Sequence, residues 1–177
     1  NYGYESGANA ILKEVRKGVT REQALKTGLL TKQAGIINIP EIIIGFPSET
    51  RMTVEETIDF LRQLDTWSYS INTPIPFPGT PLWEHAVDRG FIKDEEEFVL
   101  GYRRGLFINF TEFSDRELLS LVAKVHYDPY LSWLRRRGHF IIYLKTLLVR
   151  IFAVNLRQII PERTFAGIRT IYHRSRS

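Results

Sequence analysis

The chain has 177 residues, 44% hydrophobic and 25% charged, so it can bury a core and is neither disordered nor fibrous. Its 24 basic and 20 acidic residues are unevenly placed. Residues 131–177 carry a net charge of +9 with Glu162 as their one acidic residue, whereas residues 1–130 carry −5. The absence of cysteine excludes, within this chain, a disulfide, a thiolate-bound metal or iron–sulfur cluster, and a cysteine nucleophile.

The first third of the chain is predicted to begin with one strand and two helices. Residues 2–5 read as the end of a strand, and Asn9 is predicted to cap a short helix after it. Thr20 and Gln23 have the spacing of a capping box, in which each side chain binds the backbone N–H of the other residue. Gly35 is placed to end the helix that this box opens. The chain starts at Asn1 without a basic and apolar leader, so we expect no signal peptide and a start inside a domain.

A buried strand and an amphipathic helix are predicted next. Residues 36–44 are rich in β-branched side chains and almost continuously apolar, as expected for a strand covered on both faces. Thr53 and Glu56 have the spacing of a second capping box. Side chains suited to one buried helical face then recur every three or four positions: Val54, Thr57, Ile58, Leu61 and Leu64.

A third strand and helix complete an alternating pattern. Residues 69–74 are the strand candidate, Thr80 is a cap, Pro81 takes the first helical position, and Gly90 ends the helix. The order strand–helix, repeated three times, predicts parallel strands joined by right-handed crossovers. Three such strands cannot close into a barrel, so residues 1–92 are predicted to be part of a larger α/β unit.

The remaining residues, 93–177, are predicted to form a basic helical region. Ser114 and Glu117 have the spacing of a capping box. Further helical segments are predicted to be separated by Pro129, Gly138 and Pro161.

The long apolar run at residues 140–160 is interrupted by Lys145, Arg150 and Arg157, which argues against a helix that crosses a bilayer. Together with the preceding arginines, residues 131–160 could still rest on an anionic membrane surface. The simpler interpretation is a helix packed against the rest of the protein. We therefore expect a cytoplasmic protein, with a membrane-peripheral location as the alternative, and nucleic acid is disfavoured as a partner.

The loops after the three strands hold the candidate binding residues. In parallel α/β folds, ligands bind at the carboxyl ends of the strands. The loops at residues 5–7, 45–50 and 74–81 would then meet at one mouth, offering carboxylates, hydroxyls, backbone N–H groups and apolar walls. Such a mouth suits a ligand with an ammonium group or ribose hydroxyls and a flat apolar ring.

These loop residues also have structural interpretations. Ser6 and Gly7 fit a turn, Ser48 and Thr50 fit helix caps, and Glu49 fits the positive N-terminal end of the next helix. The four histidines lie at spacings unlike those of metal ligands, and no phosphate-binding glycine motif is present. Residues 3–7 miss the nucleophile-elbow spacing by one position, which disfavours a hydrolase.

Three separated motifs carry a resemblance to a known family. They are YESG at residues 4–7, followed by AGI at 34–36; IIIGFPSET at 42–50, followed by Thr53, Glu56, Thr57 and Phe60; and PFPGTPL at 76–82. In order and spacing, residues 1–92 resemble the C-terminal half of a radical S-adenosylmethionine (radical SAM) domain. The pattern is most like the subgroup that carries a cobalamin-binding domain ahead of the barrel.

This resemblance implies an α/β fold: the second half of a partial (β/α)6 TIM-like barrel with parallel strands, followed by an α-helical region. It also implies reductive cleavage of S-adenosylmethionine at a four-iron four-sulfur cluster to start radical chemistry, such as cobalamin-dependent methyl transfer. By position, the implied cofactor-binding residues are Glu5 and Ser6 at the ribose or methionine end, Ile43, Ile44 and Gly45 beside the adenine, Glu49 shaping its loop, and backbone groups of Pro74 and Ile75 at the adenine edge.

The family's cluster is held by three cysteines after its first strand, so the resemblance implies cluster ligands outside this chain, in a missing N-terminal half of the same polypeptide. The complete parent is expected to be the enzyme, with a small-molecule cofactor and a substrate that the sequence does not identify, and this chain alone is expected to be inactive. No catalytic and no metal-binding residue is assigned within it. The alternatives are a non-catalytic module that binds S-adenosylmethionine or a partner, and a peripheral membrane adaptor that acts through the basic tail.

Overall fold

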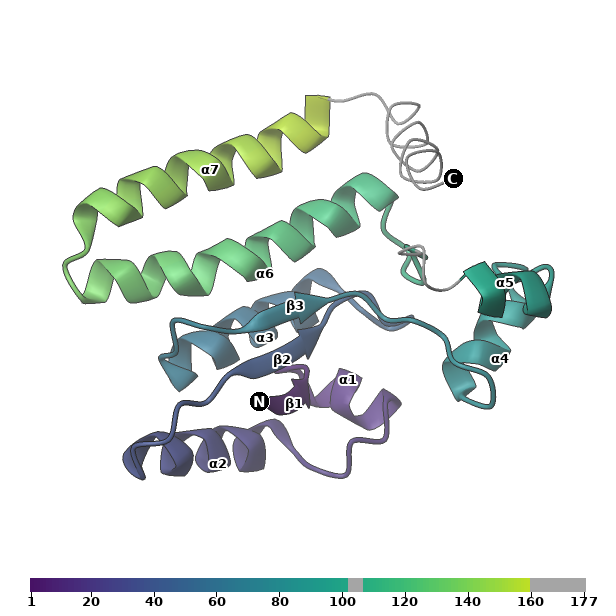
Figure 1. Ribbon diagram of the computed structural model, residues 1–177, viewed down its shortest axis with the longest axis horizontal. Coiled ribbons are helices and arrows are strands. Elements are labelled where there is room, and N and C mark those ends of the chain that lie inside the picture. Colours follow the sequence, from purple (N-terminus) through teal and green to yellow (C-terminus); the bar gives the residue numbers. More distant parts are fainter. Residues whose placement is uncertain (102–106, 160–177) are drawn as a thin grey trace.

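The computed structural model describes residues 1–101 and 107–159 and shows a small sheet with helices packed on and around it (Figure 1). In chain order the elements are β1 (Tyr2–Glu5), α1 (Asn9–Glu14), α2 (Arg21–Gln33), β2 (Pro40–Ile43), α3 (Arg51–Leu64), β3 (Ser70–Asn72), α4 (Pro81–Asp88), α5 (Glu95–Gly101), α6 (Asp115–Arg136) and α7 (Phe140–Ile159). The α/β class predicted from the sequence is confirmed.

The three strands pair in the order β1–β2–β3, and both pairs are parallel. Gly3 lies opposite Glu41, and Glu41 lies opposite Ser70. The prediction of three neighbouring parallel strands is therefore confirmed. Each strand is followed by a helix, as the alternating pattern indicated.

The second strand is shorter than the apolar run that predicted it. Residues 36–39 lie outside β2, and the side chains of Ile36 and Ile37 are 59% and 71% exposed. Pairing with β1 starts at Pro40, which lies opposite Tyr2 in the register, and the backbone N–H of Tyr2 donates to the carbonyl of Ile39 at 3.0 Å.

Helix starts follow local capping rules, with two corrections. The capping boxes of α2 and α6 form at Thr20 and Ser114 as predicted, and Thr80 caps α4. The box predicted at Thr53 is wrong: α3 begins one turn earlier, because Thr50 and Thr53 bind each other's backbone N–H groups.

Asn9 does not cap α1, so that prediction is also wrong. Ala8 is the N-cap residue of this helix, and no side chain caps it. The Asn9 side chain instead accepts a hydrogen bond from the backbone N–H of Arg21, 2.7 Å away, at the start of α2. Asn9 therefore ties the first two helices together.

Pro129 does not separate two helices, contrary to the sequence-based prediction, but lies inside the 22-residue helix α6. Proline lacks an N–H and crowds the carbonyl four residues earlier, so it usually interrupts a helix. Here the Tyr69 hydroxyl donates to the carbonyl of His126 at 2.7 Å and accepts the N–H of Tyr130 at 3.0 Å. Tyr69 thus satisfies the two groups that a regular α-helix would join to each other. Gly138 separates α6 from α7 as predicted, and Pro161 lies outside the described residues.

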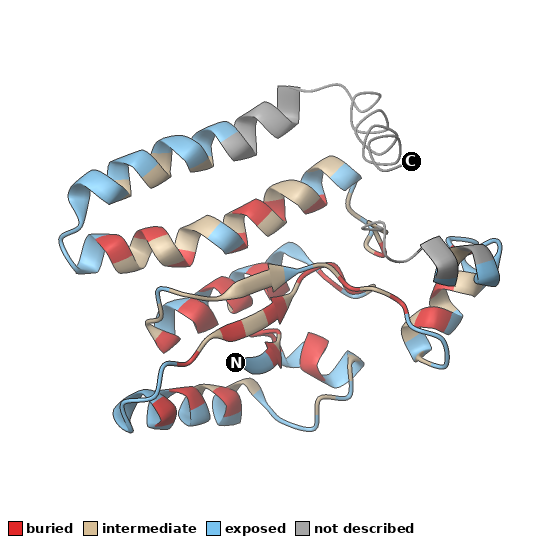
Figure 2. Ribbon diagram, viewed as in Figure 1, coloured by how far each residue is buried: buried red, intermediate tan, exposed pale blue. Residues whose placement is uncertain are grey.

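The main core lies between the sheet, α3 and α6. Ile42, Ile44, Phe60 and Leu118 are among its fully buried side chains. The predicted inner face of α3 is buried throughout, from Val54 to Leu64. Helix α7 packs along α6, and Figure 2 shows its outer side exposed along the described part. Within residues 1–101 and 107–159, no helix is long and apolar enough to cross a membrane.

Candidate functional site

The loops that follow the strands lie at one end of the sheet. Because all three strands run parallel, Glu5 at the end of β1, Gly45 after β2 and Ile75 after β3 are at the carboxyl edge. The backbone N–H of Ile44 donates to the carbonyl of Asn72 at 2.9 Å, which continues the pairing of β2 and β3 up to this edge. The predicted common mouth therefore has the right topology.

The two faces of the sheet differ in character. Tyr4, Ile42 and Ile44 point into the main core, on the side where α3 lies behind β2 and β3 in Figure 1. Alternate residues point to the second face, which the described helices leave largely uncovered over β2 and β3. This second face carries Gly3, Glu41 and Ile43 from β1 and β2, and Ser70 and Asn72 from β3.

Glu5 lies on the second face, paired with a lysine. It adopts a left-handed backbone conformation, φ 66°, at an irregularity in the β1–β2 pairing. Its carboxylate accepts a hydrogen bond from Lys17 Nζ at 3.0 Å. A Cβ atom added to Gly3 would be 3.0 Å from Glu5 Oε1 and 3.5 Å from Lys17 Nζ, so the ion pair lies over Gly3. Both side chains are partly exposed and accessible to a ligand.

Three polar residues on the second face, Glu41, Ser70 and Asn72, were missed by the sequence analysis. Glu41 is the strand partner of Gly3 and accepts a hydrogen bond from Asn1 at 2.9 Å. Asn72 Nδ2 donates to Ser70 Oγ at 3.1 Å on β3. The available signal was their alternation with the apolar positions of short strands, but the strand register was needed to place them on one face.

Ser6 is fully buried and belongs to an internal hydrogen-bond network. Thr57 Oγ1 donates to the Thr53 carbonyl at 3.0 Å, so the 3.1 Å contact between Ser6 Oγ and Thr57 Oγ1 is donated by Ser6. Ser6 Oγ also accepts the N–H of Ala8 at 3.1 Å, and Thr57 Oγ1 accepts the N–H of Gly7 at 3.0 Å. This network attaches the loop after β1 to α3.

Glu49 holds the loop after β2. Its carboxylate accepts the N–H of Gly45 at 3.1 Å and the hydroxyl of Thr53. Glu49 is only 5% exposed, and burial raises the pKa of its carboxyl group, against the lowering effect of these hydrogen bonds. Gly45 has φ 115°, a backbone conformation that favours glycine. This conformation and the hydrogen bond from the Gly45 N–H to Glu49 together fix the shape of the loop.

The remaining predicted site residues lie near the same edge with different exposure. Ile44 is fully buried in the core, so only its backbone can reach a ligand. Ile43 is half-buried and packs against Ile11 and Phe46. Pro74 is buried and Ile75 is half-buried after β3.

The edge therefore combines a carboxylate and an ammonium group, amide and hydroxyl groups, and half-buried apolar side chains. This combination can bind a ligand that has both charged and aromatic parts. Across the described residues, no group of three or more His, Cys, Asp or Glu side chains could hold a metal ion.

No protein-family model matches the chain. Among curated proteins, it is 31% identical over 134 residues to an uncharacterized methyltransferase of Pyrococcus horikoshii, a match that covers 73% of this chain and 28% of the relative. It is 40% identical over 77 residues to a protein assigned as a methylthiotransferase in Methanocaldococcus jannaschii, covering 42% of this chain and 17% of the relative. It is 37% identical over 84 residues to a tRNA-2-methylthio-N(6)-dimethylallyladenosine synthase of Treponema pallidum, covering 45% of this chain and 18% of the relative. The chain thus spans less than a third of the length of these relatives.

Proposed function

Because this chain is homologous to methyltransferase and methylthiotransferase proteins of the radical SAM superfamily, we propose that it forms the second half of the S-adenosylmethionine-binding barrel of a methyl- or methylthio-transferring enzyme. The resemblance that three separated motifs indicated is confirmed at the level of the superfamily. The activity of the whole enzyme is part of the proposal.

The observation that carries this proposal is the polar second face of a parallel sheet. In a β/α barrel, helices cover the outside and the strands turn their other face toward the interior. Here α3 covers one face, while Glu41, Ser70 and Asn72 point away from it. Strands supplied by the rest of the polypeptide would enclose this polar face and complete a partial (β/α)6 barrel. Residues 1–92 are the barrel portion in this proposal, and residues 93–177 are the helical region behind it.

The site residues fit S-adenosylmethionine by the chemistry of their groups. The Glu5 carboxylate suits the ammonium group or ribose hydroxyls, and Ile43 offers an apolar surface for the adenine. The backbone of Ile44, Gly45, Pro74 and Ile75 offers hydrogen-bonding groups near that surface. Ser6 and Glu49 act in this proposal by holding the two loops, because their polar atoms are already bonded inside the protein. The bound cofactor would supply the transferable methyl group and the source of a 5′-deoxyadenosyl radical.

An iron–sulfur cluster does not fit the residues of this chain. The chain has no cysteine, and its described residues form no cluster of metal-ligating side chains. We propose that the four-iron four-sulfur cluster is bound by another part of the polypeptide. A cobalamin-binding domain ahead of the barrel is likewise proposed from the motif pattern, and none of the three relatives' names mentions cobalamin.

The test uses the full-length protein that contains this chain, reconstituted without oxygen. We expect it to bind S-adenosylmethionine in calorimetry and to release 5′-deoxyadenosine when reduced. Glu5→Gln should raise the dissociation constant roughly tenfold or more, because a charge-assisted hydrogen bond contributes about 1.5–3 kcal/mol. Glu84→Gln, which removes an exposed carboxylate on α4, is the control and should change binding by less than about twofold.

Three outcomes separate the alternatives. Binding without 5′-deoxyadenosine release, together with the lack of three closely spaced cysteines upstream, would show a non-catalytic binding module. Equal affinity of the Glu5→Gln variant and the unchanged protein would remove Glu5 from the site. No binding of S-adenosylmethionine by the full-length protein would refute the proposal.

A further inference from the structure

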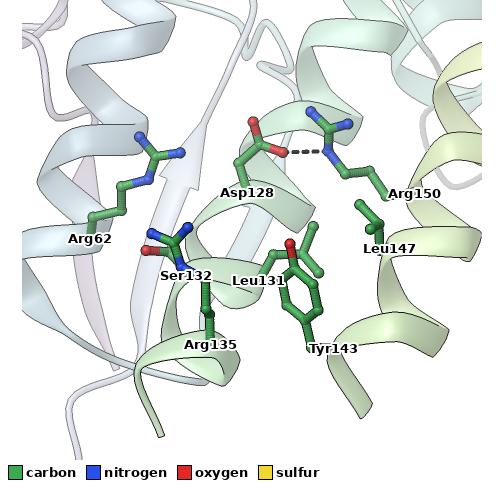
Figure 3. A pocket seen from close by; sticks show the side chains of 8 residues that line it. All are labelled: Arg62, Asp128, Leu131, Ser132, Arg135, Tyr143, Leu147 and Arg150. Atoms are coloured by element: carbon green, nitrogen blue, oxygen red, sulfur yellow. Dashed lines mark hydrogen bonds and ion pairs between the residues drawn. The ribbon is translucent and has the colours of Figure 1, made fainter. Parts of the chain in front are cut away.

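Helices α3, α6 and α7 together line a groove of about 470 Å³, here called the arginine groove (Figure 3). Arg62 comes from α3, Ser132 and Arg135 come from α6, and Tyr143 and Arg150 come from α7. A cavity of this size is in the range of small-molecule binding sites. None of its lining residues belongs to the loops after the strands, so the arginine groove is separate from the candidate site at the sheet edge.

Two arginines of the groove have no acidic partner. The Arg62 and Arg135 side chains make no hydrogen bond or ion pair with any other described residue. Asp128 is the acidic residue that lines the groove, and it is paired with Arg150. The carboxylates three positions before and after Arg62 in the sequence are paired with other cations. Because three arginines and one aspartate line the groove, it carries a net charge of +2.

The hydroxyl groups of the groove are available as hydrogen-bond donors. Arg136 Nη1 donates to Ser132 Oγ at 2.7 Å, so this oxygen already accepts one hydrogen bond and its hydrogen is available for another acceptor. The Tyr143 hydroxyl has no hydrogen-bond partner among the described residues. Guanidinium and hydroxyl donors with an excess of positive charge are complementary to an oxyanion, and the planar fork of arginine suits phosphate in particular.

An apolar wall lies beside these donors. It is formed by Leu131, Leu147 and the ring of Tyr143. In Figure 3 these side chains lie between α6 and α7, whereas the guanidinium groups of Arg62 and Arg135 lie toward α3. A phosphate ion alone would fill only a small part of the 470 Å³, so the groove has room for an organic substituent against this wall.

We propose that the arginine groove binds a small phosphate monoester with an apolar substituent. Arg62 and Arg135 donate to the phosphate oxygens, and the substituent packs against Leu147 and Tyr143. A monoester has a charge of about −1.5 to −2 at neutral pH, which matches the net charge of the groove. RNA would need cations along several successive phosphates, but the neighbouring arginines of α6 and α7 are already paired with Asp65 and Asp128. This proposal is independent of S-adenosylmethionine binding.

The test is calorimetric titration of the full-length protein that contains this chain with phenyl phosphate. Arg62→Gln and Arg135→Gln should each raise its dissociation constant roughly tenfold, because each removes a charge-assisted hydrogen bond. Arg89→Gln makes the same change in charge at an exposed position after α4 and should change the constant by less than about twofold. Affinity for S-adenosylmethionine should be the same in all three variants, which separates this test from that of the proposed function.

A second pair of variants tests the apolar wall. Leu147→Ala should weaken the binding of phenyl phosphate roughly fivefold and leave the affinity for inorganic phosphate within about twofold, because it removes contact with the ring alone. Leu148→Ala is the control, since Leu148 is 68% exposed on α7 and does not line the groove, and it should change neither affinity by more than about twofold. Circular dichroism should show that all variants remain folded.

Several results would overturn the proposal. No binding of phenyl phosphate, or equal affinities of the unchanged protein and the Arg62→Gln and Arg135→Gln variants, would contradict it. Methyl phenyl phosphate, a diester with a single negative charge, should bind roughly tenfold more weakly, and equal affinity for it would contradict the charge match. Inorganic phosphate binding as tightly as phenyl phosphate would refute the apolar wall. A short RNA that displaces phenyl phosphate and binds more tightly would assign the arginines to nucleic acid.

Discussion

Replacing Tyr69 by Phe tests whether a single hydroxyl allows proline inside α6. The hydroxyl donates to the carbonyl of His126 and accepts the N–H of Tyr130, and phenylalanine keeps the ring while removing both bonds. The hydrogen bond to Tyr130 is partly buried and the one to His126 is exposed, so we take the lower end of the cost of an unpaired group, about 1 kcal/mol each. Tyr69→Phe should therefore lower the free energy of unfolding by about 2 kcal/mol, which corresponds to a decrease in Tm of roughly 4–8 °C.

The assay is urea unfolding followed by circular dichroism, with a matched control and a second background. Tyr127→Phe removes a hydroxyl on the same helix that has no hydrogen-bond partner among the described residues, and should change stability by less than about 0.5 kcal/mol. Pro129→Ala restores the missing N–H and lets Tyr130 bond to His126 directly. In that background, Tyr69→Phe should cost less than about 1 kcal/mol. A loss below about 0.5 kcal/mol in the natural sequence, or equal losses in both backgrounds, would refute the reasoning.

Two further predictions concern packing and charge. Gly7→Ala should lower the free energy of unfolding by about 3 kcal/mol, because the added Cβ would lie 2.4 Å from Phe60 Cβ. The control, Gly18→Ala, has open space around it but φ 75°, and should lower it by about 1 kcal/mol. A smaller loss for Gly7→Ala than for Gly18→Ala in urea unfolding would contradict the packing. Arg137, with other cations, holds the pKa of Asp65 well below its usual range, so Asp65 stabilises the fold above pH of about 4 and this contribution is lost as pH falls. Because the Asp65 side chain is 29% exposed and its three cationic partners are 38–47% exposed, Asp65→Asn should cost only about 0.5–1 kcal/mol at neutral pH. A difference in stability between the natural protein and Asp65→Asn that stays constant down to pH of about 2 would disprove the coupling.

The features predicted correctly from the sequence depend on residues close together in the chain. A capping box needs two side chains three positions apart, so Thr20 and Ser114 open their helices where the local pattern indicates. The parallel arrangement follows from the alternation of strands and helices, which restricts the possible connections. Where two local patterns overlap, as at Thr50 and Thr53, the local rule alone cannot choose the start of the helix.

The features predicted wrongly depend on contacts between distant residues. The start of β2 depends on its pairing with β1, in which Pro40 lies opposite Tyr2, and an apolar run alone does not reveal that register. Pro129 stays inside a helix because Tyr69, sixty positions earlier in the sequence, contacts its backbone neighbours. Glu41 likewise joins the candidate site only because its strand lies beside Gly3.

The candidate site also contains two kinds of residue: those that hold its loops in place and those whose side chains can contact a ligand. Sequence position placed Ser6 and Glu49 at strand ends, but position does not reveal where a hydroxyl or a carboxylate finds its hydrogen bonds. Ser6 is bonded to Thr57 on α3, and Glu49 is bonded to the N–H of Gly45, so both hold loops in place. Glu5 differs, because its ion pair with Lys17 is partly exposed over Gly3 and an incoming ammonium group could replace the lysine. Substitutions at Ser6 and Glu49 should therefore act first on stability, whereas substitution at Glu5 should act first on ligand affinity.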